Sequence, residues 1–234
     1  MPDSVKHTLA RFVGNREISP DWLSFSANEQ HALILLAQQE GLAPLLYWRL
    51  SQSGRFSSLS GEQRDVLRTS YASTWMANRQ IFKELELLSA ALEQAGVPLV
   101  LLKGACFALT IYEDIGLRPM GDLDILVPQD KFDLALRVAQ AQGYEDNLPQ
   151  AAPGLRELLN HEVCLQKPGL AFALEIHHSL VADKTYAYAV PVDWFWLQTE
   201  SLVETGIGMR FGAILMLSPE AQLLYAAAHA MLQH

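Results

Sequence analysis

The stretch VLLKGACFALTIYEDIGLRPMGDLDILV, residues Val100–Val127, decides the fold of this 234-residue chain. It ends in DLDILV at residues 122–127, where acidic and apolar residues alternate before the pattern becomes wholly apolar. Because successive side chains of a strand point to opposite faces, Asp122 and Asp124 share one face and Leu123 takes the other. Two carboxylates this close repel each other unless a cation lies between them. A divalent ion with oxygen ligands is the natural candidate.

Strand and helix patterns alternate around this stretch. The turn Lys167-Pro168-Gly169 separates two extended runs and predicts a hairpin. Ser218-Pro219-Glu220 has the residue types that open a helix. The expected strands are 97–102, 123–127, 161–166, 171–178 and 209–215, and the expected helices are 105–112, 129–142 and one from 219. Strands that alternate with helices and then form a hairpin predict an α/β (α+β) fold class with a mixed β-sheet.

The N-terminal part of the chain has helical patterns and no group of residues that suggests chemistry. Ser26 with Glu29, and Ser60 with Gln63, have the spacing of capping boxes at helix starts. Helices are expected from residue 27 to Gly41, over 44–51, and from residue 61 to about 95.

A third carboxylate lies on another predicted strand, in ALEIHH at residues 173–178. By alternation, Glu175 shares a face with His177, while Leu174 and Ile176 point to the core. Three acids on neighbouring strands, two of them one residue apart, are what a two-metal phosphoryl-transfer site needs. His177 either lines this site or packs structurally. His161-Glu162 lacks the second histidine of a zinc-protease helix, so we assign it no metal role.

The composition excludes several classes of protein. The chain has 17 Lys and Arg against 26 Asp and Glu, a net charge of −9, which argues against a broad footprint on duplex nucleic acid. Its two cysteines are far apart and form no zinc or disulfide pattern, so a cytoplasmic location is expected. The charged N-terminus does not resemble a secretory signal. The longest apolar run, residues 97–102, is too short to span a bilayer, and no membrane partner is expected.

Three motifs together resemble the uncharacterised nucleotidyltransferase family, within the DNA polymerase beta-like nucleotidyltransferase superfamily. They are LKG at 102–104, RPMGDLDILV at 118–127 and LEIHHSL at 174–180. The similarity covers roughly residues 80–234 and implies a nucleotidyltransferase fold. It also implies three regions: a helical N-terminal region (1–95), a nucleotidyltransferase-like α/β domain (96–217) and the start of a C-terminal helical region (218–234).

The resemblance implies a role for each residue of the site. The implied catalytic and metal-binding acids are Asp122, Asp124 and Glu175, and the implied nucleotide-binding residues are Lys103, Gly104, Arg118 and His177. The superfamily usually opens the first helix with a Gly-Ser pair, whereas this chain has Lys103-Gly104-Ala105, so Lys103 supplies a phosphate charge instead of the hydroxyl. Arg118 either contacts a phosphate or steadies the turn through a salt bridge.

The resemblance implies transfer of a nucleoside monophosphate from an NTP to an acceptor hydroxyl or similar group, with Mg²⁺ (or Mn²⁺) as the cofactor. The acceptor is unknown, and the acidic balance favours a small molecule or a protein over long nucleic acid. The alternatives are a nucleotide-binding or regulatory protein with little turnover, and an interaction module. The oligomeric state is left open. The apolar pattern after residue 219 continues to His234, which predicts a longer protein whose further helical part helps to form the acceptor side of the cleft.

Overall fold

The computed structural model describes residues 3–14, 22–146, 162–180, 191–202 and 208–232. His161, the expected first residue of a strand, and the last two residues of the expected C-terminal helix lie outside these ranges. The chain divides into two compact units, Met1–Arg79 with Tyr112–Pro119, and Gln80–Ile111 with Met120–His234. The three regions predicted from the sequence, with boundaries at 95 and 217, stay a prediction.

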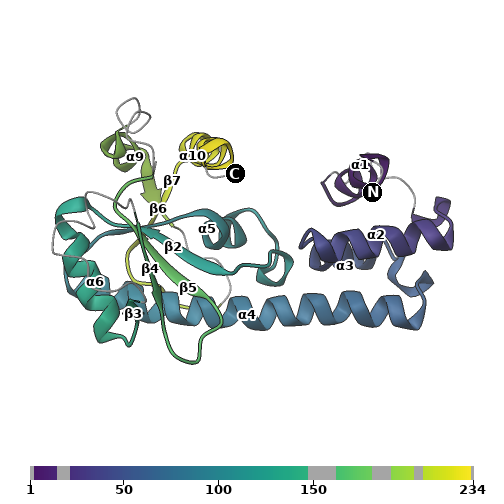
Figure 1. Ribbon diagram of the computed structural model, residues 1–234, viewed down its shortest axis with the longest axis horizontal. Coiled ribbons are helices and arrows are strands. Elements are labelled where there is room, and N and C mark those ends of the chain that lie inside the picture. The colour runs from purple at the N-terminus through teal and green to yellow at the C-terminus, as the bar shows by residue number, and fades with distance from the viewer. Residues whose placement is uncertain (1–2, 15–21, 147–161, 181–190, 203–207, 233–234) are drawn as a thin grey trace. The chain divides into compact units, whose positions relative to one another are not determined.

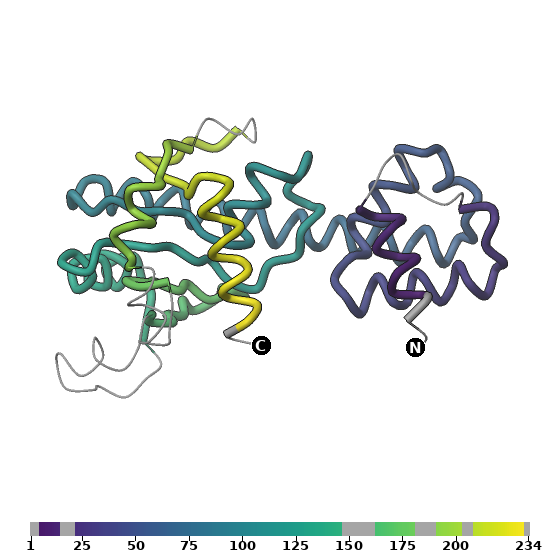
Figure 2. Tube along the Cα trace, turned by 90° about the horizontal axis from the view of Figure 1, so that it is seen from above, coloured from purple at the N-terminus to yellow at the C-terminus, as the bar shows by residue number. Residues whose placement is uncertain are grey.

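The first unit is helical. Its elements are α1 (Asp3–Gly14), η1 (Trp22–Ser24), α2 (Ala27–Gln39), α3 (Ala43–Gln52), η2 (Phe56–Ser58), the first part of α4 (Gly61–Gln94) and η3 (Ile115–Leu117). Both predicted capping boxes are present: the Ser26 hydroxyl accepts from the Glu29 N–H, and the Ser60 hydroxyl accepts from the Gln63 N–H. Helices α1, α2 and α3 pack around a buried apolar cluster that includes Trp22 (Figure 2).

The segment Tyr112–Pro119 joins this unit through a buried asparagine. Asn78 is completely buried, and its Nδ2 donates hydrogen bonds to the carbonyl oxygens of Ile115 at 2.5 Å and Arg118 at 2.6 Å. A buried amide donor must find acceptors, and here the two carbonyls hold the segment that carries Arg118.

The second unit is built on a mixed sheet with the strand order β3-β4-β5-β2-β1-β7-β6. The strands are β1 (Leu99–Leu101), β2 (Asp122–Leu126), β3 (Glu145–Asp146), β4 (Glu162–Gln166), β5 (Ala173–His177), β6 (Thr199–Ser201) and β7 (Ile214–Leu217). Strand β2 pairs parallel with β5, and β5 pairs antiparallel with β4, as the predicted hairpin requires. Together with its helices, the sheet confirms the predicted α/β fold class.

Helices cover both faces of this sheet (Figure 1). They are the second part of α4, α5 (Lys103–Thr110), η4 (Gln129–Lys131), α6 (Phe132–Ala141), α9 (Val192–Leu197) and α10 (Pro219–Leu232). Figure 1 shows α4 and α6 on one side and α5, α9 and α10 on the other. Leu126 of β2, on the same face as Asp124, packs with Phe195 of α9 and Tyr225 of α10 in one buried cluster. The face that carries the acids is therefore apolar at the end of β2.

The aromatic segment 191–197 forms α9, with Phe195 buried in the core. One sequence expectation in this unit was wrong. The strand expected over 209–215 is β7, which begins only at Ile214. The reason is visible on α4: Ser89 accepts the hydrogen bond of the Gly212 N–H, and Glu93 accepts that of the Ala213 N–H. Main-chain donors that bond to helix side chains cannot also pair with a strand.

Among the described residues, most exposed large apolar side chains are scattered, but several lie together on α10. Leu223 and Met231 of α10 are 73% and 82% exposed, whereas Ala221 and Tyr225 pack on the sheet. Among the described helices, none combines the length and the apolar character that crossing a bilayer requires.

Candidate active site

The register of two parallel strands brings the predicted acids together. Asp124 of β2 lies directly opposite Glu175 of β5, and Asp122 lies opposite Ala173. His177 is two residues beyond Glu175, so it lies on the same face by alternation. The side chain of Asp124 is 1% exposed and that of Glu175 is 22% exposed, so this acidic pair is largely withdrawn from water.

Lys103 meets both acids from the end of β1. The Leu102 N–H donates to the Asp124 carbonyl at 3.1 Å, which ties the end of β1 to β2. Lys103 Nζ then lies 2.6 Å from Asp124 Oδ1 and 3.7 Å from Glu175 Oε2. Among the described residues, Lys103 alone has a positive φ without being glycine, at 43°. Residues other than glycine rarely adopt this backbone conformation, because it costs about 1–2 kcal/mol. Such strain is common at functional sites.

His177 closes the site from the other side. It is 1% exposed, with Nε2 2.9 Å from Asp124 Oδ1 and 3.7 Å from Glu175 Oε2. Its other ring nitrogen, Nδ1, lies 3.0 Å from Glu162 Oε2 on β4. His177 is thus both buried and in contact with the two acids, and its role at the site stays a prediction.

Sequence reasoning missed Glu162. The hairpin register could have found it, because β4 and β5 are joined by the six residues Lys167–Phe172 and pair so that Glu162 lies opposite His177. Counting outward from the predicted turn places these two residues together.

The charges of these groups depend on one another. Burial and then the neighbouring Asp124 carboxylate raise the pKa of Glu175 to about 7, as expected for crowded acids. Burial also acts to raise the pKa of Asp124, but His177 and Lys103 outweigh it and hold that pKa below its ordinary value. Burial alone would lower the pKa of both His177 and Lys103, and the carboxylates around them raise it instead. Asp124 therefore stays ionised, with the Lys103 ammonium and the His177 imidazole against its carboxylate.

The arrangement fits a divalent cation. One ligand atom each from Asp124, Glu175 and His177 lie within 4.8 Å of one another. Two carboxylates and an imidazole are ligands for divalent ions, and an ion there would take the place of the Lys103 charge between the acids. Asp122, the third predicted metal ligand, is half-buried on the same face, two residue pairs away, and does not belong to this group of three.

The predicted nucleotide-binding residues lie in different parts of the chain. Helix α5 begins at Lys103, two residues earlier than expected, so the buried Gly104 is its second residue. Its N-cap, Leu102, makes no side-chain hydrogen bond to the first turn, which leaves that turn suited to a phosphate. Arg118 belongs to the first unit, and its role at a phosphate stays a prediction.

Comparison with protein families identifies the chain. The model of the family described as "Uncharacterised nucleotidyltransferase" matches residues 26–234. The chain belongs to this nucleotidyltransferase family. The predicted family is thereby confirmed, and with it a nucleotide as the expected class of substrate. A divalent metal is the usual cofactor of this family, and the carboxylate–histidine group is one that could hold it.

Solved structures show more distant likenesses. A provisionally assigned nucleotidyltransferase from Thermotoga maritima has 14% sequence identity and a TM-score of 0.45 over 65% of this chain and 86% of its own. An antigenic nucleotidyltransferase-like protein from Paracoccidioides brasiliensis has 17% identity and a TM-score of 0.37 over 60% of this chain and 62% of its own. Both likenesses are too distant to carry an argument about this chain. A search of curated proteins found no match.

Proposed function

We propose that this nucleotidyltransferase moves a nucleoside monophosphate from an NTP to an acceptor hydroxyl or similar group. In this reaction the acceptor oxygen bonds to the α-phosphorus, the bond from that phosphorus to the bridging oxygen breaks, and pyrophosphate leaves. The acceptor loses its proton to solvent. The observation that supports the proposal best is the pairing of Asp124 with Glu175 beside Lys103, at the uncapped start of a helix.

Each part of the site has a task in this proposal. Asp122, Asp124 and Glu175 hold divalent ions on one face of the sheet. When bound, Mg²⁺ or Mn²⁺ supplies positive charge to the phosphate oxygens and increases the acidity of the acceptor hydroxyl. Lys103 and the first N–H groups of α5, including that of Gly104, bind the phosphates. Electrostatic stabilisation of the transferring phosphoryl group accounts for most of the catalysis in such reactions.

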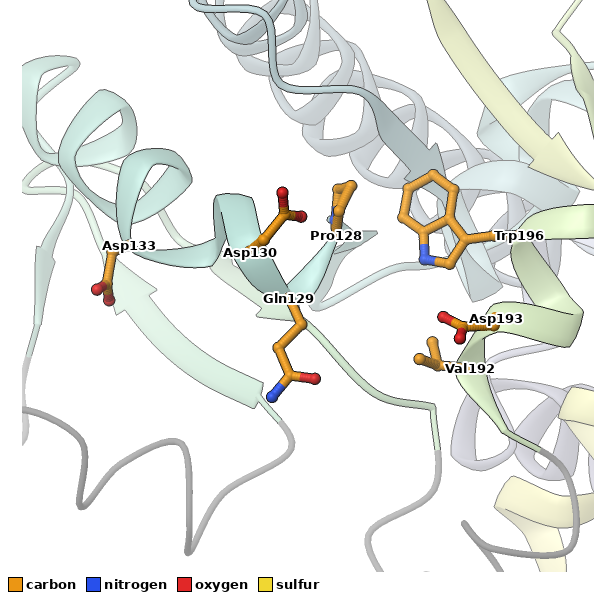
Figure 3. Close-up of a pocket in the computed structure, with 7 residues that line it drawn as sticks. All are labelled: Pro128, Gln129, Asp130, Asp133, Val192, Asp193 and Trp196. Carbon is orange, nitrogen blue, oxygen red and sulfur yellow. The ribbon is translucent and has the colours of Figure 1, made fainter.

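A pocket in the same unit, lined by none of these site residues, has the character expected for binding a compact acceptor without phosphates. It has a volume of about 700 Å³ and lies between the segment after β2 and helix α9 (Figure 3). Asp130 and Asp193 reach it from opposite sides, with the indole of Trp196 beside them. Carboxylates repel a phosphate backbone, whereas an apolar ring and acids suit a small or basic molecule. This favours a small molecule or a protein side chain over long nucleic acid, in the cytoplasm where NTPs are available.

One observation favours the second candidate function, a nucleotide-binding protein with little turnover. Asp124 Oδ1 is contacted by two side chains, the Lys103 ammonium at 2.6 Å and His177 Nε2 at 2.9 Å. An incoming ion has to compete with both. If Lys103 and His177 keep the ion away from Asp124, a nucleotide can still bind through Lys103 while its transfer is slow.

The test is a screen of the four NTPs with Mg²⁺ or Mn²⁺, by calorimetry for binding and by pyrophosphate release for transfer. Wild-type protein is expected to bind at least one NTP in a metal-dependent manner and to release pyrophosphate once an acceptor is supplied from a set of small hydroxyl and amine compounds. Asp124→Asn is the inactive control. NTP binding without pyrophosphate release for any acceptor, with or without metal, would support the second candidate, and no NTP binding under any of these conditions would exclude both.

A further inference from the structure

The imidazole of His177 is buried against the two acids and cannot move out of the site. It is 1% exposed, and its Nε2 contacts the same two oxygens, Asp124 Oδ1 and Glu175 Oε2, that Lys103 Nζ contacts. Lys103 is 21% exposed on a flexible stem, so its ammonium can move aside when an ion arrives. The buried ring of His177 has no such freedom. An ion held between Asp124 and Glu175 would therefore find Nε2 within reach as a ligand.

The electrostatics of that contact allow only one productive state of the ring. An N–H directed at a cation is repelled, whereas a ring nitrogen with a free lone pair binds it. Nε2 has a free lone pair when the proton of the neutral ring is on Nδ1, and Glu162 Oε2, 3.0 Å from Nδ1, favours a proton there. In the metal-free protein Nε2 faces Asp124 Oδ1 at 2.9 Å, so an arriving ion would displace any proton on Nε2 to solvent. A carboxylate behind a metal-binding histidine selects the tautomer and fixes the orientation of the ring in this way.

We propose that His177 is a nitrogen ligand of the metal site, held by Glu162 as a positioning residue, and that the site therefore prefers a divalent transition-metal ion such as Mn²⁺ to Mg²⁺. This inference deepens the proposed function, because it rests on a divalent ion binding between Asp124 and Glu175. Mg²⁺ is a hard ion that strongly favours oxygen ligands, whereas imidazole suits first-row transition metals. The acid triad expected from the resemblance, with Asp122 as the third ligand, would offer oxygens alone.

Strand register places Glu162 against the ring of His177. Glu162 is on β4 and His177 on β5, directly opposite each other in the antiparallel register. The side chain of Glu162 is 28% exposed, so it reaches the buried ring from the rim of the site rather than from the core. A change at Glu162 can therefore alter the ring without opening a cavity.

The test uses the purified whole chain and Mn²⁺ alone, so that it reads the metal site without nucleotide or turnover. Pulsed electron paramagnetic resonance of bound Mn²⁺ is expected to show the nitrogen modulation of a coordinated imidazole in the wild type. His177→Asn is expected to remove that modulation. Glu162→Gln is expected to weaken Mn²⁺ binding about 10–100-fold, as loss of such outer partners typically does. Glu145→Gln, the same substitution at an exposed position on neighbouring β3, is the matched control and should bind Mn²⁺ as the wild type does.

The outcomes separate this inference from the proposed function. Mn²⁺ bound without nitrogen modulation, equal affinities for Mn²⁺ and Mg²⁺, or no bound ion at all would each overturn the inference. Unaltered Mn²⁺ affinity in Glu162→Gln would overturn the positioning role. Melting curves of each variant check that it is folded, and Glu162→Gln keeps the test decisive if His177→Asn does not fold. A nitrogen-coupled Mn²⁺ site in a protein that never releases pyrophosphate would overturn transfer and leave the inference standing.

Discussion

Lys103→Met removes a single charge at the centre of the site. The contact of Lys103 Nζ with Asp124 Oδ1 is 2.6 Å long, and the two side chains are 21% and 1% exposed. A hydrogen bond to a charged group at such a site contributes about 1.5–3 kcal/mol. Methionine keeps most of the apolar side chain, and the backbone strain at the positive φ of residue 103 is similar for lysine and methionine. The loss of stability is therefore mainly electrostatic. For a chain of this size, 1 kcal/mol shifts the melting temperature by about 2–4 °C, so we expect a decrease of about 3–12 °C without metal.

The same substitution should change how the protein responds to ligands. Without the ammonium, a divalent ion no longer competes with it for Asp124, so Mn²⁺ should stabilise Lys103→Met more than the wild type. NTP binding at saturating metal should weaken about 10–100-fold, because a phosphate loses a full positive charge. The assays are thermal melts in a chelator and with millimolar Mn²⁺, and calorimetry with the NTP. Lys83→Met, at an exposed position on α4, is the control with the same change of charge.

Two results would refute this reasoning. Unchanged metal-free stability would mean that the contact with Asp124 contributes nothing to the fold. Reduced stability with unaltered NTP affinity would make Lys103 a structural partner of Asp124 and remove it from the phosphate site.

Three other outcomes are expected. Millimolar Mg²⁺ or Mn²⁺ should raise the melting temperature of the wild type but not of Asp124→Asn, and an equal response in both would contradict the placement of the ion. Lys167→Met should lose about 1–3 kcal/mol of unfolding free energy, because Lys167 Nζ lies 2.7 Å from Glu84 Oε2 at a largely buried contact, while the metal response stays the same; unaltered stability in urea would speak against that contact. At pH 8 a thiol reagent should modify one cysteine before the other: Cys164 is exposed and Cys106 is buried. Burial raises the pKa of both thiols, that of Cys106 to about 11, so the accessibility of Cys164 decides the order. Cys164→Ser should abolish the fast phase, and a fast phase that survives this change would show that Cys106 is accessible.

Local patterns in the sequence determined the elements and the acids. The alternation in DLDILV predicted that Asp122 and Asp124 share a face of a strand, and β2 has that strand at Asp122–Leu126. The turn at Lys167-Pro168-Gly169 predicted the hairpin of β4 and β5. These signals depend on neighbours a few residues apart, and the chain's own geometry sets them. The motifs were also sufficient for the family and the fold class, both of which were confirmed.

The contacts between the site residues were decided by the tertiary structure. No local pattern places Glu175 opposite Asp124, because parallel pairing of β2 with β5 joins residues 51 positions apart, and a shift by one residue would have sent Glu175 to the other face. The start of β7 likewise depended on side chains of α4 more than a hundred residues earlier.

The partners of Asp124 and His177 also could not be predicted from the sequence and were decided by the tertiary structure. The sequence indicated Lys103 as a phosphate ligand and gave Glu162 no role, whereas the structure places Lys103 against Asp124 and Glu162 against His177. A buried charge has to find its counter-charge wherever the packed fold brings one within reach. That partner is set by strand register and by where a helix starts. The sequence by itself therefore determined which residues can do the chemistry, and only the tertiary structure decided which of them touch.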